Sequence, residues 1–359
     1  MQDKAMSKWL SPLMAFCLSF LIIATLAPIT GIQIDRQLDF WILWLVTMFI
    51  LALPICYLEI ALAKRSKTTA VQALSMLTRD ADASQKWRIV GWMGVVFIPF
   101  LAGAMLNYAS NVLAVATPDI ATHLLFVVLA VVALALSLIP RQILVLIAAV
   151  GVISSLLLAN VMGTALPAWH VTAIEFSEWG SATVLALVAS GLGMGLYWQS
   201  SLAAVQQQDQ ATKSALPIWI AQFIAVIAFG FFAVKAQVSA LALVVAMVAA
   251  AALMFNMARE QLQQRQLHTV IQWAIVVIAT LVWAVPNIAT VFNPLLLLWG
   301  LIISLIYAVF AGWIMKISHL RKSMNFSSEV FYNLWRVAVR VVLPLSIIVA
   351  IIAVLGQLI

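Results

Sequence analysis

The residues best suited to bind a small molecule lie between Ser190 and Ser201, where glycines alternate with apolar side chains. Gly191, Gly193 and Gly195 fall inside an apolar run long enough to cross a membrane. Glycine costs a helix interior about 1 kcal/mol relative to alanine, and non-helical backbone inside a membrane is tolerated only where it lines a cavity or is buried in protein. Such an interruption is typical of a transporter's binding site, with Ser190 and the glycines at the solute. Close helix packing through small residues is the alternative.

Few other residues inside the apolar runs are polar. Glu59 lies near the inner end of the second run, and an ionisable residue inside a membrane is a functional candidate by default. It would act either as a buried carboxylate tied to a helix break or a cation, or as an interfacial partner of Lys64 or Arg65. Tyr108 in the third run is a candidate for the wall of a central cavity, and Gln222 is a polar residue of the seventh.

Residue types that carry catalysis or bind metals form no recognisable arrangement in the chain. The four histidines are scattered, and no His-Glu-x-x-His motif, cysteine pair or phosphate loop is present. We therefore expect neither a catalytic residue nor a resident metal or cofactor, and an intramembrane enzyme is the least favoured function.

The composition indicates a membrane protein. Of 359 residues, 65% are hydrophobic and only 9% are charged, whereas soluble domains carry about 25% charged residues. The mean hydropathy is +1.12, and the sequence pI is about 9.7. Because the basic residues cluster beside apolar runs, we read them as markers of membrane topology and expect no nucleic-acid partner.

The chain is expected to be all-α, because apolar runs of about 20 residues cross a bilayer as helices. We predict about eleven spans in a single transmembrane domain, residues 1–359. They cover residues 9–31, 40–63, 90–116, 121–139, 142–165, 180–203, 215–234, 238–258, 269–288, 293–315 and 330–357.

The orientation follows from the positive-inside rule. With the N-terminus in the cytoplasm, all of the 19 Lys and Arg residues except Arg36 and Lys235 fall on the inner side. The C-terminus then lies outside. The short loops favour a bacterial inner membrane.

Several short motifs, taken in order along the chain, resemble those of the neurotransmitter:sodium symporters. No single motif is specific, but their order and spacing cover nearly the whole sequence. They are Lys8-Trp9, Pro54 with Glu59 to Lys64, Asn107-Tyr108, Ser190 to Gly195 with Asp209 and Ser214-Ala215, and Phe331 to Arg336 with Pro344.

The resemblance implies a LeuT-type fold of two inverted repeats, about residues 9–165 and 180–315, followed by an extra helix at about 330–357. In this fold the first helix of each repeat is broken at the membrane midplane, and solute and sodium bind in the breaks. In the first helix, Pro28 would make the break, and Thr25 and Thr30 would cap the freed backbone groups, which places Thr25 at the solute.

The chain departs from the family at the residues that bind sodium. The stretch Ala246 to Asn256 of the eighth span has no hydroxyl, and Gln222 stands where the family has a sodium-binding Asn. We therefore expect a divergent secondary transporter for a small amino acid or amine, embedded in the lipid bilayer. Its coupling ion would be sodium at a weakened site or a proton through Glu59. The alternative is a non-transporting scaffold, sensor or subunit that keeps the fold and binds a protein partner.

Overall fold

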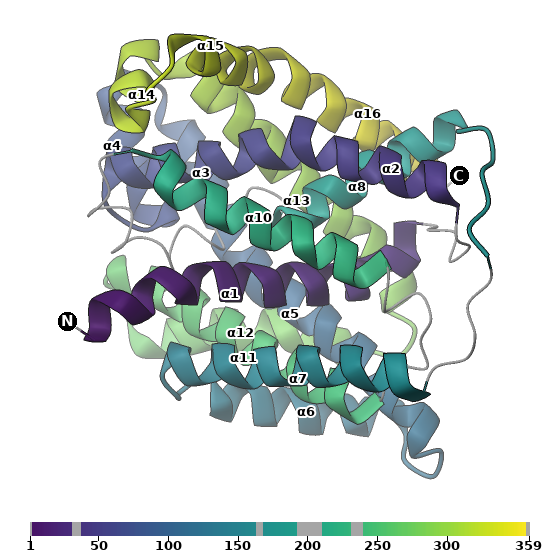
Figure 1. Cartoon of the computed structure of the whole chain (residues 1–359). Coiled ribbons are helices and arrows are strands. Elements are labelled where there is room, and N and C mark those ends of the chain that lie inside the picture. The colour runs from purple at the N-terminus through teal and green to yellow at the C-terminus, as the bar shows by residue number, and fades with distance from the viewer. Residues whose placement is uncertain (1, 31–36, 163–167, 192–209, 231–239, 357–359) are drawn as a thin grey trace.

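All the regular secondary structure that a computed structural model of the chain describes is helical, apart from one isolated bridge between Gln37 and His170. The described residues are 2–30, 37–162, 168–191, 210–230 and 240–356. The helices lie side by side, so that their ends form two opposite faces of the molecule (Figure 1).

The helical segments match the predicted membrane spans. Seven segments are long and apolar enough to cross a membrane, and four shorter apolar helices accompany them. In chain order the long segments are Trp9–Thr30, Leu38–Ser66, Gln85–Ala116, Arg141–Val161, Leu241–Gln264, Ala289–Ile314 and Glu329–Gly356. The shorter ones are Thr122–Leu136, Phe176–Ala189, Thr212–Ala228 and Thr269–Ala284. Each predicted span overlaps one of these segments, so the all-α fold is confirmed, and seven of the eleven predicted spans meet the length and composition of a membrane-crossing helix.

The individual helices divide some of these segments. They are α1 (Gln2–Leu26), α2 (Leu38–Thr47), α3 (Leu53–Ser66), α4 (Ala70–Asp80), α5 (Ile89–Ala116), α6 (Thr122–Leu136), α7 (Arg141–Met162), α8 (Phe176–Ala189), α10 (Thr212–Ala228), α11 (Ala240–Gln264), α12 (Thr269–Leu281), α13 (Ala289–Val309), α14 (Ile317–Met324), α15 (Glu329–Val337) and α16 (Leu343–Gly356).

Helix α11 packs closely against α5 and α7 because its contact surface is made of small residues. The side chain of Ala246 is fully buried, and a Cβ added at Gly151 of α7 would come within 2.8 Å of the Ala246 Cβ. Small residues let helix backbones approach in this way inside membranes. The alanine-rich stretch that lacks sodium-binding hydroxyls is therefore a packing surface.

The first span is interrupted, but not at the midplane as the resemblance implied. Helix α1 is continuous from Gln2 to Leu26, although it contains Pro12, and it passes into a 3-10 turn at Ala27–Thr30. Because this turn begins 18 residues after Trp9, it lies about 27 Å along the helix, near the far end of a bilayer core of about 30 Å. The α-helix thus ends just before Pro28, where the sequence predicts a break, but this position is toward the end of the segment Trp9–Thr30 and not at its centre.

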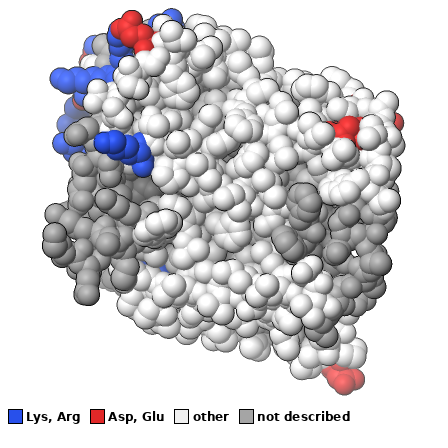
Figure 2. Space-filling model, viewed as in Figure 1, with Lys and Arg blue, Asp and Glu red and all other residues white. Residues whose placement is uncertain are grey.

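The basic residues gather at one end of the helices. Figure 2 shows Lys and Arg side chains over the end that carries α4 and α14, whereas the few charged side chains visible at the opposite end on this face are acidic. The N-terminus lies toward the basic end and the C-terminus toward the other (Figure 1). We call these the basic end and the acidic end.

The last two spans are joined at two wide helical turns. A π-helical turn at Phe310–Ile314 follows α13, and another at Ala338–Val342 separates α15 from α16. The Arg340 guanidinium donates to the Gly312 carbonyl, and the Trp313 indole donates to the Arg340 carbonyl at 3.0 Å. Arg340 of the last span thus caps the end of its neighbour.

Candidate solute and ion site at the end of helix α8

Helix α8 stops inside the protein, at the first of the predicted glycines. It spans Phe176–Ala189, and 14 residues measure about 21 Å, which is too short for a bilayer core of about 30 Å. Ser190 follows with 1% of its surface exposed, and Gly191 has φ of 75°, a conformation that glycine adopts without strain. The interruption predicted for the sixth span therefore begins at Ser190 and Gly191. Gly193 and Gly195 lie outside the described residues.

Two serine hydroxyls bond to the carbonyls that α8 leaves free at this end. Ser190 Oγ donates to the Leu187 carbonyl at 2.7 Å, and Ser19 Oγ of α1 donates to the Ala189 carbonyl at 2.6 Å. The last carbonyls of a helix carry its partial negative charge, so a buried helix end favours a cation or an ammonium group. Sequence reasoning missed Ser19. Its signal was a single hydroxyl in the apolar stretch from Leu13 to Ile23.

Gln222 of α10 is buried without a hydrogen-bond partner. None of its surface is exposed, and neither its amide nitrogen nor its carbonyl oxygen bonds to any described residue. Leaving such a group unsatisfied costs about 1–3 kcal/mol, so buried amides without partners are rare. A carboxamide in this state is suited to bind a cation, a water molecule or the polar part of a solute.

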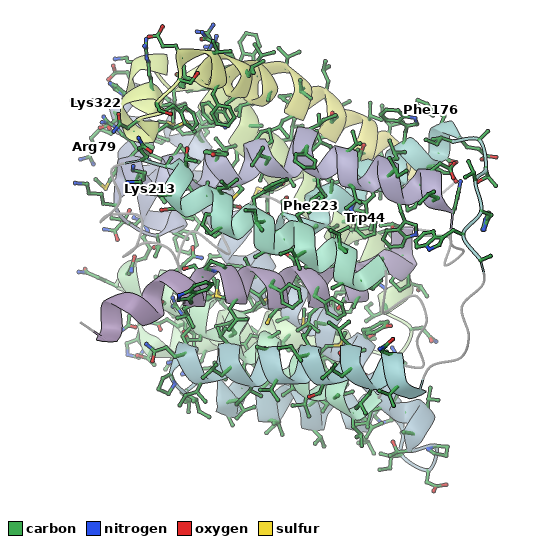
Figure 3. All side chains as sticks on the ribbon, viewed as in Figure 1. Trp44, Arg79, Phe176, Lys213, Phe223 and Lys322 are labelled. Atoms are coloured by element: carbon green, nitrogen blue, oxygen red, sulfur yellow. The ribbon has the colours of Figure 1, made fainter. Side chains whose placement is uncertain are left out.

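Ser19 and Gln222 lie at similar distances along two helices that both begin toward the basic end. Ten residues separate Trp9 from Ser19, and nine separate Lys213 from Gln222, which correspond to about 15 Å and about 14 Å along their helices. Both helices start from the basic end, where Figure 3 shows Lys213. Half of a bilayer core is also about 15 Å. Counted from Trp9 and from Lys213, each polar group therefore lies about half the thickness of a bilayer core along its helix.

Helices α1, α8 and α10, which carry these groups, pack against one another. Among its neighbours, α1 contacts α10 most extensively, and both also contact α8. Toward the acidic end the junction is closed by aromatic rings. The Phe229 ring centroid lies 6.0 Å from that of Phe20 and 6.4 Å from that of Trp44, and Figure 3 shows Trp44 toward this end. These aromatic rings thus lie between the polar groups and the acidic end.

The other predicted solute residues make different contacts. Thr25 is buried but donates to the Leu21 carbonyl of its own helix at 2.8 Å. Tyr108 of α5 is half-buried against the apolar core. Its neighbour Asn107 donates to the Trp283 carbonyl at 3.3 Å. This polar residue therefore links α5, the third span, to the ninth span.

Glu59 is also buried, but on α3. Its surface is 5% exposed, and its charge lies close enough to Cys56 and Tyr307 to act on both side chains. Arg65, one of the two cations considered as its partner, pairs with Asp80 at 2.7 Å. Helix α3 packs against α10, so Glu59 lies on the helix next to the one that carries Gln222. In the described part of the chain no three His, Cys, Asp or Glu side chains cluster as metal ligands would.

Comparison with known proteins identifies the fold. No family model and no curated protein sequence matches the chain. Among solved structures, MhsT in complex with L-phenylalanine matches with a TM-score of 0.63 at 15% identity, covering 96% of this chain and 98% of MhsT. The Eremococcus coleocola manganese transporter, in complex with an aromatic bis-isothiourea substituted compound, matches with a TM-score of 0.57 at 12% identity, covering 99% and 87%.

The chain has a LeuT-type fold. The likeness to these two structures, one of them a manganese transporter, extends over nearly all of this chain. The LeuT-type arrangement agrees with a polytopic integral membrane protein and with a sixth span that is interrupted at the end of α8.

Proposed function

We propose that the chain is a secondary active transporter for a small amino acid or amine. The observations that carry the proposal are the buried end of α8 and, on α10, which packs against α8, the buried Gln222 with no hydrogen-bond partner among the described residues. Together they offer helix carbonyls to an ammonium group and a carboxamide to a second polar group or an ion. The transporter fold of both structural neighbours supports the same class of function.

The solute would bind between α1, α8 and α10. Its ammonium group would lie at the carbonyl end of α8, with Ser190 and Ser19 holding that end in place. Gly193 and Gly195 would continue the wall of the site, as the sequence predicts. Thr25 and Tyr108 would line the path from the acidic end.

Coupling to two sodium ions is not favoured by this chain. Sodium takes several oxygen ligands, and the surface of α11 offers buried alanines whose backbone carbonyls are engaged within the helix. We infer that at most one sodium ion is coupled, at Gln222. The second candidate is a proton carried by Glu59, because a buried carboxylate in a span is typical of proton relays.

Uptake into proteoliposomes tests the proposal. A panel of labelled amino acids and amines is offered under an inward sodium gradient and, separately, under an inward proton gradient. Accumulation under one gradient confirms transport and names the ion. Gln222→Met should abolish sodium-driven uptake, and Glu59→Gln should abolish proton-driven uptake. Absence of accumulation under either gradient, together with a stoichiometric protein that co-purifies, would favour the non-transporting scaffold instead.

A further inference from the structure

A cavity lies at the basic end, away from the proposed solute site. It is formed by α14 and the start of α15 and has a volume of about 420 Å³. Small-molecule sites range from about 300 to 1,000 Å³. Its lining includes Arg321, Lys322, Phe326, Ser328, Glu329 and Tyr332.

The electrostatics of the cavity favour an anion. Arg321 pairs with Glu329, whereas Lys322 is exposed and has no ion pair within the described part of the chain. Arg336 and Arg340 lie close enough to Tyr332, in the cavity wall, for their charges to act on it. Glu329 is the single acidic residue in the lining, and its carboxylate is already matched by Arg321. The surplus charge is positive.

An apolar stripe leads from this cavity along the membrane-spanning surface of α15. Val330, Leu334 and Val337 are 69%, 64% and 51% exposed. Their spacing of four and three residues places them on one face of the helix. In a span, such a face is in contact with lipid chains. A molecule with an anionic head and an apolar tail would therefore fill the cavity with its head and cover the stripe with its tail.

We propose that this cavity binds the phosphate of an anionic phospholipid. Basic pockets beside membrane spans bind the head groups of such lipids. Lys322 would meet the phosphate directly, Ser328 would donate from its hydroxyl, and Arg321 would be shared between the phosphate and Glu329. The acyl chains would lie against Val330 and Leu334.

Native mass spectrometry of the purified full-length protein tests the proposal. Dioleoyl-phosphatidylglycerol and dioleoyl-phosphatidylcholine are titrated in parallel. Lys322→Gln should weaken phosphatidylglycerol binding about fivefold and leave phosphatidylcholine binding unchanged. This factor is the loss in affinity expected when one cation near an anionic lipid surface is removed. Lys322→Arg should retain most of the binding. The matched control is Lys213→Gln, since Lys213 is an exposed lysine at the same end but outside the cavity (Figure 3).

Three outcomes would overturn the proposal. The first is equal binding of the two lipids by the unmodified protein. The second is an equal loss in Lys213→Gln, which would indicate general attraction to the basic end. The third is displacement of phosphatidylglycerol by millimolar inorganic phosphate, which would indicate a site for free anions. Because Lys322 is exposed, the variant should fold, and unchanged thermal unfolding in detergent checks this.

Discussion

Replacing Gln222 by Met should stabilise the protein in the absence of solute. Methionine is close to glutamine in volume and needs no hydrogen bonds, so the packing between α10 and α1 is kept. Two side-chain atoms of Gln222 are buried without a partner among the described residues. At about 1 kcal/mol each, the lower end of the cost of a buried unsatisfied group, their removal gains about 2 kcal/mol. This corresponds to a rise of a few degrees in the unfolding midpoint.

The matched control is Gln272→Met on α12. Gln272 is also buried, with 5% exposure, but its amide donates to the Leu267 carbonyl at 2.8 Å. Its replacement should lower stability by about 1 kcal/mol, because a satisfied bond is lost. The opposite signs of the two changes separate an unpartnered amide from a paired one.

The assay is thermal unfolding in detergent, with and without a solute from the uptake panel. Gln222→Met should unfold at a higher temperature than the unmodified protein when no solute is present, and added solute or sodium should stabilise it less. A midpoint that falls as far as in Gln272→Met would refute the reasoning, since it would mean that the Gln222 amide is satisfied in the folded protein.

Three further substitutions test other contacts. Ser19→Ala removes the hydroxyl bonded to the end of α8 and should cost about 1–3 kcal/mol and weaken solute binding, both measured by thermal shift. Gly103→Ala would place a Cβ 2.4 Å from Trp283 Cδ1, so unfolding should become easier by about 1–3 kcal/mol, and an unchanged midpoint would contradict this packing. Arg340→Gln should cost about 1.5–3 kcal/mol because the Gly312 carbonyl loses a charged donor, and Arg340→Lys should restore part of it.

The spans and the interrupted helix could be predicted from local sequence. Apolar runs and flanking basic residues are properties of single segments, and the glycine after Ser190 marks the position where α8 ends. A glycine with positive φ at a helix end needs no information from other helices. For these reasons the architecture and the start of the interruption were correctly predicted.

The partners of the polar groups could not be predicted in the same way. Ser19 is a functional candidate only because α1 brings its hydroxyl to the carbonyl of Ala189, 170 positions away in the sequence. Likewise, Asn107 bonds to the end of the ninth span, 176 positions away in the sequence. Which polar side chain meets which backbone group depends on helix rotation and depth, and hydropathy is insensitive to both.

A cryo-electron microscopy structure with bound solute tests the central claim most directly. The sample is the full-length protein saturated with the amino acid or amine that accumulates best in proteoliposomes. The account predicts density for the solute between α1, α8 and α10, with its ammonium group at the carbonyl end of α8 and a polar contact to Gln222. Solute density elsewhere, with the Gln222 amide bonded to protein groups and side chains filling this junction, would contradict it.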